Sequence, residues 1–76
     1  MNIVINGKAG AKVGNLQVFT REGAVNAYKI FVRLFQRDMT MAASVVLSDA
    51  SDDMHRIGFT WDELEEIENA IFAEAV

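Results

Sequence analysis

Residues 43–59, which read ASVVLSDASDDMHRIGF, are the stretch on which the predicted architecture depends. The first six residues are rich in β-branched and apolar side chains, a composition that favours a strand. The next five combine Asp, Ser and Ala, as turns do. In the last six, His55, Ile57 and Phe59 fall on one face of an alternating pattern, which is strand periodicity. We therefore predict a strand, a turn and a second strand at residues 43–48, 49–53 and 54–59.

The N-terminal part of the chain also predicts strands. Residues 2–6 alternate polar and apolar side chains, and the two glycines within residues 7–10 are typical of a turn. Residues 11–20 predict a second strand. Because Gly14 and Asn15 interrupt that strand, we expect a β-bulge or a longer, bent hairpin at this point.

Residues 21–38 carry the clearest helical pattern in the sequence, and Thr20 is a suitable N-cap for it. At 100° per residue the polar side chains gather in one arc, which contains Glu22, Asn26, Lys29, Arg33, Gln36 and Arg37. Residues 28–36 also alternate as a strand does, but the long polar stripe favours the helix. The remaining apolar arc is wider than one sheet face usually covers. We therefore expect this helix to be deeply buried or shared with a partner.

The sequence TWDE at residues 60–63 is a capping box and predicts the start of a second helix directly after Thr60. The Thr60 hydroxyl accepts a hydrogen bond from the Glu63 amide, and the Glu63 carboxylate accepts one from the Thr60 amide. Phe59 and Leu64 stand at the spacing of a hydrophobic staple. The apolar stripe of this helix comprises Trp61, Leu64, Ile67, Ile71, Phe72 and Ala75.

Together these elements predict a small α+β domain with the order ββαββα. The simplest packing is a four-stranded, mostly antiparallel sheet with both helices on one face. With 76 residues, the chain is expected to form a single domain over residues 1–76. It contains no cysteine, so neither disulfides nor a cysteine-ligated zinc ion can reinforce the thin core of so short a chain.

Charge is divided unevenly along the chain, although the net charge is only −4. Residues 1–37 carry six basic side chains and one acidic side chain, whereas residues 38–76 carry one basic side chain and ten acidic ones. Either the two halves pack together and partly neutralise each other, or the protein presents a two-signed surface to another molecule. Because no segment has the pattern of a secretory leader or the length of a membrane span, the expected location is cytoplasmic.

No grouping of residues predicts catalysis or a bound cofactor. His55 is the only histidine, and no serine stands in a recognisable nucleophile motif. Alternate residues from Asp49 to His55 offer ligands for one cation, but the stretch lacks the glycine and the final Glu of a calcium loop. We interpret it as a solvated turn, with His55 at the core margin, and predict neither a metal nor a small-molecule ligand. No glycine-rich loop links a strand to a helix, as phosphate binding requires.

The acidic residues give the leading hypothesis, which is a non-enzymatic protein-interaction module. It would dock its acidic turn and C-terminal helix on a basic, nucleic-acid-binding surface of a larger protein, as an inhibitor or adaptor. Small acidic phage proteins that block nucleic-acid-handling machines, such as anti-CRISPR or anti-restriction proteins, offer a comparison on size and charge alone. The predicted contact residues are Asp49, Asp52, Asp53, Asp62, Glu65, Glu66 and Glu68.

Glu68 differs from the other acidic residues because it falls inside the apolar stripe of its helix. A carboxylate in that position needs an arginine, a route to the rim or a partner protein. We favour an internal pair with Arg56 or with an arginine of the first helix over a partner contact.

Two other functions remain open. The wide apolar arc of the first helix and the bipolar charge also suit a structural, self-assembling subunit such as a homodimer. The third hypothesis is a nucleic-acid-binding domain, although few aromatic residues accompany its basic side chains and the overall acidity opposes phosphate binding. Its candidate residues are Lys8, Lys12, Arg21, Lys29, Arg33 and Arg37.

Overall fold

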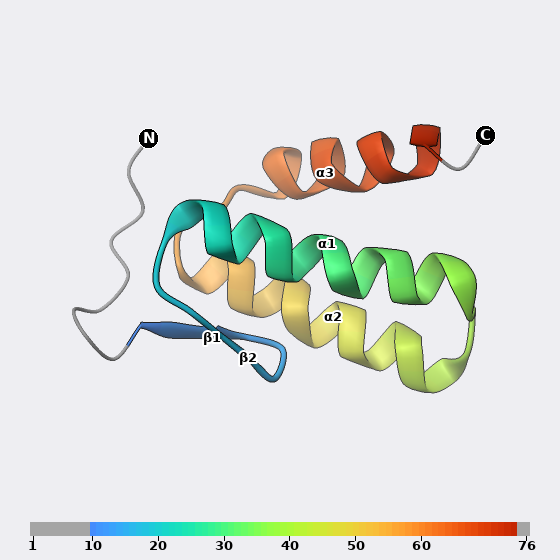
Figure 1. Cartoon of the computed structure of the whole chain (residues 1–76), viewed down its shortest axis with the longest axis horizontal. Coiled ribbons are helices and arrows are strands. Elements are labelled where there is room, and N and C mark those ends of the chain that lie inside the picture. The colour runs from blue at the N-terminus through green and yellow to red at the C-terminus, as the bar shows by residue number, and fades with distance from the viewer. Residues whose placement is uncertain (1–9, 75–76) are drawn as a thin grey trace.

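The computed structural model describes residues 10–74; the strand predicted for residues 2–6 and most of the glycine-containing turn after it, residues 7–9, lie outside this range. The described chain forms a β-hairpin followed by three helices (Figure 1). Its elements are β1 (Ala11–Val13), β2 (Leu16–Val18), α1 (Arg21–Arg37), α2 (Met41–Arg56) and α3 (Trp61–Glu74). The predicted ββαββα order and four-stranded sheet are therefore wrong. Residues 10–74 contain a single sheet of two strands, and a helix stands where the second strand pair was predicted.

α2 occupies the stretch that the sequence pattern assigned to two strands and a turn. Its buried side chains are Ala43, Ala50 and Met54, and Leu47 packs against the same core. These positions recur every three or four residues, which lines one face of a helix. Strand propensity depends strongly on context, so this buried face outweighs the β-branched residues between 43 and 48. The aspartates that suggested a turn lie between the buried positions of the helix.

Specific backbone bonds fix both ends of α2. At the N-terminus the Thr40 hydroxyl accepts a hydrogen bond from the Ala43 amide at 3.1 Å. At the C-terminus Gly58 has a φ of 117°, and the Phe59 amide donates back to the Met54 carbonyl at 3.1 Å. This is a Schellman ending, which needs a glycine at its left-handed position and brings Phe59 into the core. The predicted strand at residues 54–59 is therefore the last turn of α2 and its cap.

The strand predicted over residues 11–20 is itself a hairpin. Gly14 and Asn15 form its two-residue turn, and Val13 pairs with Leu16 across it. Gly14 has a φ of 62°, and a Cβ there would lie 2.5 Å from Cζ of Phe31. Only glycine meets both conditions, so the expected irregularity at this point is a tight turn pressed against α1.

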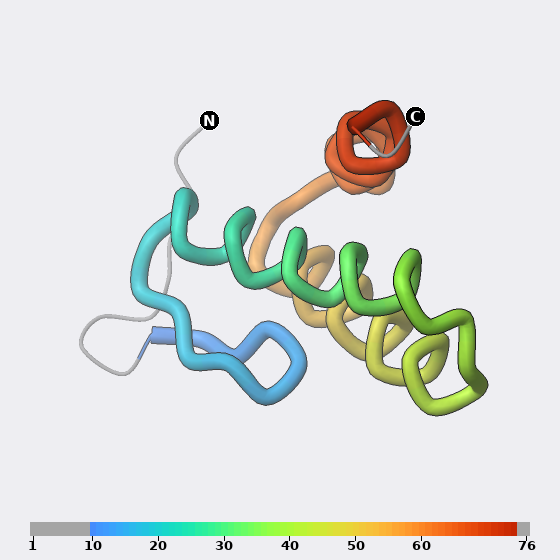
Figure 2. The backbone as a smooth tube through the Cα atoms, turned by 45° about the vertical axis from the view of Figure 1, so that its right-hand side comes forward, coloured from blue at the N-terminus to red at the C-terminus, as the bar shows by residue number. Residues whose placement is uncertain are grey.

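α1 is the centre of the molecule: α2 runs antiparallel beside it, and the hairpin and α3 lie on opposite sides of it (Figures 1 and 2). The helix predicted over residues 21–38 is confirmed, as is its cap, since Thr20 accepts a hydrogen bond from the Gly23 amide at 2.9 Å. Packing from several sides buries most of the wide apolar arc, but Ile30 and Leu34 remain exposed. None of the helices in residues 10–74 combines the length and hydrophobicity that a membrane crossing requires.

Candidate protein-interaction surface

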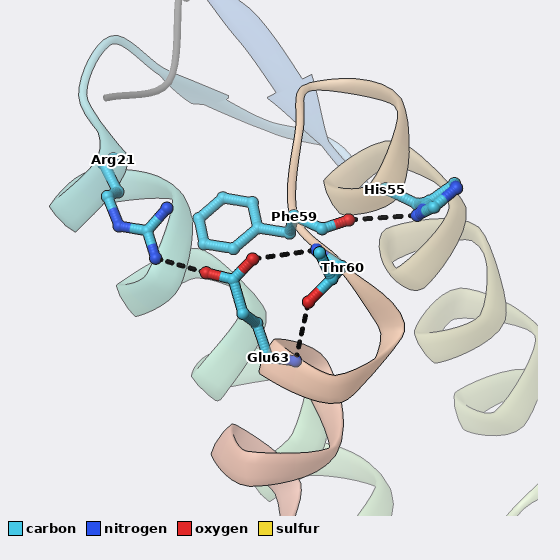
Figure 3. Close-up of polar contacts among 5 residues, drawn as sticks. All are labelled: Arg21, His55, Phe59, Thr60 and Glu63. Carbon is cyan, nitrogen blue, oxygen red and sulfur yellow. Dashed lines mark hydrogen bonds and ion pairs between the residues drawn. The ribbon is translucent and has the colours of Figure 1, made fainter. Parts of the chain in front are cut away.

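Glu63 stabilises the start of α3 and joins it to α1 (Figure 3). The predicted capping box is confirmed: the Thr60 amide donates to Glu63 Oε1 at 2.9 Å, and the Glu63 amide donates to Thr60 Oγ1 at 3.1 Å. Nη2 of Arg21 donates to the other carboxylate oxygen. The backbone hydrogen bond from Thr60, and then the one from Arg21, lower the pKa of Glu63 to about 2.

We call the contact region between α1 and α3 the seam; it comprises the ion pair of Arg21 with Glu63 and two further contacts. The Arg21 guanidinium lies over the Phe59 ring, 4.6 Å from its centroid, in a cation–π contact. Farther along, Arg33 donates to Glu74 at 3.3 Å. The basic and acidic halves of the chain therefore do pack together and neutralise each other in part. For the nucleic-acid hypothesis this means that Arg21 and Arg33 are already paired, while Lys8 lies outside the described residues.

Asp53 is a predicted contact residue that the fold uses internally. Its Oδ2 accepts a hydrogen bond from the Gly14 amide at 3.0 Å, which ties α2 to the hairpin turn. Its Oδ1 accepts from Arg56 Nη1 at 2.9 Å. Arg56, one of the expected partners of Glu68, is therefore paired with Asp53 instead.

Glu68 also turns inward, but its partner is a tyrosine, so the expected pairing with an arginine is wrong. The Tyr28 hydroxyl, from α1, lies 3.0 Å from the Ser51 hydroxyl of α2, and Tyr28 also interacts with the Glu68 carboxylate of α3. Burial raises the pKa of Glu68, the hydrogen bond from Tyr28 opposes this, and the charge of Glu65 adds to the rise. Burial likewise raises the pKa of Tyr28. All three helices thus meet at one polar junction.

The other predicted contact residues face solvent, on two different elements. Asp49 and Asp52 are exposed on α2, and Asp62, Glu65 and Glu66 are exposed on α3. Both views of the backbone show α2 and α3 as separate helices against α1 (Figures 1 and 2). The structure therefore divides the predicted acidic surface into an α2 part and an α3 part.

The α2 part combines the two aspartates with exposed apolar side chains. Met41, Val45, Asp49 and Asp52 follow one another at helical spacing, and we call these four residues the α2 stripe. Met41 is 82% exposed and Val45 is 52% exposed. Beside the stripe lies a hollow of about 450 Å³ between α2 and the hairpin turn. It is lined by Gly14, Asn15, Val46, Asp49, Asp52, Asp53 and Arg56.

The alternate residues from Asp49 to His55, interpreted from the sequence as a solvated turn, lie on the helix α2. On a helix successive members of this set point about 200° apart, which places Asp49 and Asp53 on one side of the axis and Ser51 and His55 on the other. In residues 10–74 no three potential metal ligands among His, Asp and Glu come together. His55 does not lie in a sheet: its ring stacks on Trp61 with 4.2 Å between centroids, and Nδ1 lies 3.0 Å from the Phe59 carbonyl oxygen.

Comparisons with protein-family models, with curated proteins and with solved structures found no match to the chain. Function is therefore inferred from the surface itself. The sequence interpretation identified the aspartates of the α2 stripe but missed its apolar members, because Val45 was assigned to a strand. The spacing of four residues from Met41 to Val45 to Asp49 is the signal that would have shown them on one helical face.

Proposed function

We propose that the protein is a non-enzymatic interaction module that docks the α2 stripe on a basic surface of a larger protein. The observation that carries this proposal is the position of two outward carboxylates in line with two exposed apolar side chains. Neither Asp49 nor Asp52 takes part in the ion pairs found within residues 10–74. Carboxylates that join none of the ion pairs within residues 10–74 are available to a cation from outside.

The apolar and acidic parts of the stripe contribute differently to docking. Adjacent exposed apolar side chains, to which Met39 adds another at 75% exposure, provide the area whose burial drives association. Methionine side chains also adapt readily to the shape of a partner. The carboxylates of Asp49 and Asp52 provide orientation and a faster encounter with a positive surface.

A surface that normally binds phosphate is the partner that this arrangement suits best. Such a surface carries lysine and arginine side chains, and the hollow of about 450 Å³ beside Asp49 and Asp52 has room for one of them. Occupying it would block nucleic acid by occlusion and charge mimicry, so the module would act as an inhibitor or adaptor. No bond is made or broken in this function.

The acidic part of α3 is a secondary contact in this proposal. Asp62 stands in the first turn of α3, where a negative charge also favours the helix dipole, so its presence has a local explanation. Glu65 and Glu66 extend the negative surface along the same helix. We place them at the rim of the interface, where a charge changes the rate of association more than the lifetime of the complex.

The first experiment identifies the partner by photo-crosslinking from a position in the α2 stripe. A photo-crosslinking amino acid replaces Val45 in the α2 stripe, and a control chain carries it at Ala73, which is exposed on α3. We expect the Val45 position to capture a protein with a basic surface that the Ala73 position does not. The purified partner is then titrated with Asp49→Lys/Asp52→Lys and with Asp62→Lys/Glu66→Lys as the matched control. The α2 variant should bind roughly tenfold weaker or worse, with the larger loss at low salt. Equal affinity for the two variants would contradict the proposal.

A further inference from the structure

The outward face of α1 bears apolar side chains that residues 10–74 leave uncovered. Ile30 is 54% exposed and Leu34 is 37% exposed, although both belong to the helix at the centre of the molecule. Phe19, which follows β2 at the edge of the same face, is 58% exposed. Exposed apolar residues that adjoin one another are a feature of contact sites.

A hollow lies along each half of this face. Its N-terminal half is a hollow of about 420 Å³ between β2 and α1, and Gly23, Asn26 and Ala27 contribute to its lining. Its C-terminal half is a second hollow of about 690 Å³ that reaches α3, and Leu34 and Arg37 contribute to its lining. Ile30 lines both hollows and so lies between the two halves.

Exposed side chains of opposite charge stand near the two ends of α1. Glu22 lies in the first turn of α1 and Arg37 in the last, and both are exposed. A partner surface that carries only positive or only negative charge would pair with only one of these two residues. A second copy of the same helix, placed antiparallel, satisfies both of them at once, because a two-fold axis brings each end against the opposite end.

We propose that this face binds a second copy of the chain in a two-fold symmetric dimer, with the two α1 helices antiparallel and the axis passing near Ile30. In that register, a residue that follows Ile30 by a given number of positions in one copy faces the residue that precedes Ile30 by the same number of positions in the other copy. Leu34 then enters the partner's hollow at the partner's Asn26. Arg37 faces the partner's Gly23 and reaches the partner's Glu22, and the same pair forms again on the other side of the axis.

The dimer interface uses a different helix from the α2 stripe, so the two proposals stand or fall separately. None of the residues Ile30, Leu34 and Arg37 belongs to the α2 stripe. A dimer would carry two copies of the α2 stripe and would gain affinity for any partner that offers two basic sites within reach.

Sedimentation equilibrium of the full chain, from low to high micromolar concentration, is the first test. The wild-type chain should shift from monomer to dimer over this range. Leu34→Asp should remain monomeric, whereas Val45→Asp, the matched control on α2, should dimerise as the wild type does. Circular dichroism of each variant shows whether it is folded. A wild-type chain that stays monomeric throughout, or a loss of dimer that is equal in both variants, would overturn the proposal.

A charge exchange tests the register without depending on an apolar substitution. Arg37→Glu and Glu22→Arg each place like charges across the axis, so each variant alone should self-associate roughly tenfold more weakly than the wild type. In an equimolar mixture both cross-axis contacts join opposite charges again, and native mass spectrometry should show the mixed dimer. A mixture that associates no better than the separate variants would contradict the proposed register.

Discussion

Carboxylates occur both in the seam between α1 and α3 and on the outer face of α2, but their surroundings differ. In the seam, Glu63 and Glu74 each meet an arginine of α1. On α2, Asp49 and Asp52 lie beside exposed apolar side chains and join none of the ion pairs within residues 10–74. The difference teaches that the role of a carboxylate depends on which cation another element brings within reach. Seam carboxylates should therefore affect stability, and α2 carboxylates should affect binding.

The largest expected effect on stability comes from Phe59, whose ring contacts Arg21 of the seam. Its side chain is 1% exposed, and the Arg21 guanidinium lies on its ring. Phe59→Ala should lower the free energy of unfolding by about 3–5 kcal/mol, since it leaves a cavity and removes the cation–π contact. Met41→Ala on the α2 stripe should change it by less than about 0.5 kcal/mol. Urea unfolding curves measure both, and similar losses for the two variants would show that the α2 stripe also holds the fold together.

A smaller loss is expected from Tyr28→Phe, which removes the hydroxyl at the junction of the three helices. Glu68 and Ser51 then lose their shared partner, and the free energy of unfolding should fall by roughly 1–3 kcal/mol. The pKa of Glu68 should rise further, because burial remains and the hydrogen bond that opposed it is gone. A double-mutant cycle with Glu68→Gln separates this coupling from simple packing. Strictly additive losses would mean that the hydroxyl and the carboxylate do not interact.

The two glutamates Glu63 and Glu68 of α3 should respond to pH with opposite signs. The pKa of Glu63 is lowered from 4.5 to about 2, so its contribution to stability is present above pH 4.5 and is lost as the pH falls towards 2. The pKa of Glu68 is raised, so its contribution is present at low pH and is lost as the pH rises through the folded-state pKa. Urea unfolding between pH 2 and 7 should show that Glu63→Gln flattens the acid side of the profile. Glu68→Gln should reduce the loss that accompanies rising pH, and a parallel shift of the whole profile by either variant would contradict these assignments.

The parts of the fold that the sequence predicted correctly depend on local bonds. The caps at Thr20 and Thr60 are made with residues three positions away, so their residue types reveal them. α2 was missed because its buried face includes two alanines, Ala43 and Ala50, which give a weak apolar signal. The β-branched residues on its outer side gave a stronger signal and suggested a strand. To choose between a strand and a helix for these residues, one must know that α1 covers the face that carries the alanines.

The candidate surface could be predicted only in part, for a related reason. The aspartates of the α2 stripe were identified from composition and do face outward. Asp53 and Glu68 were grouped with them, but each interacts with a group that is distant in the chain: Asp53 accepts a hydrogen bond from the amide of Gly14, and Glu68 interacts with Tyr28. Neither contact has a sequence signature, because only the packing of α2 on the hairpin and of α3 on α1 creates it.

The smallest expected effect on stability is that of Asp49→Lys/Asp52→Lys, which should change the free energy of unfolding by less than about 0.5 kcal/mol. The most direct test of the docking surface is a calorimetric titration. The partner that crosslinking identifies is purified and titrated with this variant and with Glu63→Gln. We predict that the α2 variant unfolds like the wild type and loses roughly tenfold or more in affinity. Glu63→Gln should unfold more easily and bind as the wild type does. The opposite result, with affinity lost in the seam variant and kept in the α2 variant, would contradict the assignment of the α2 stripe as the docking surface.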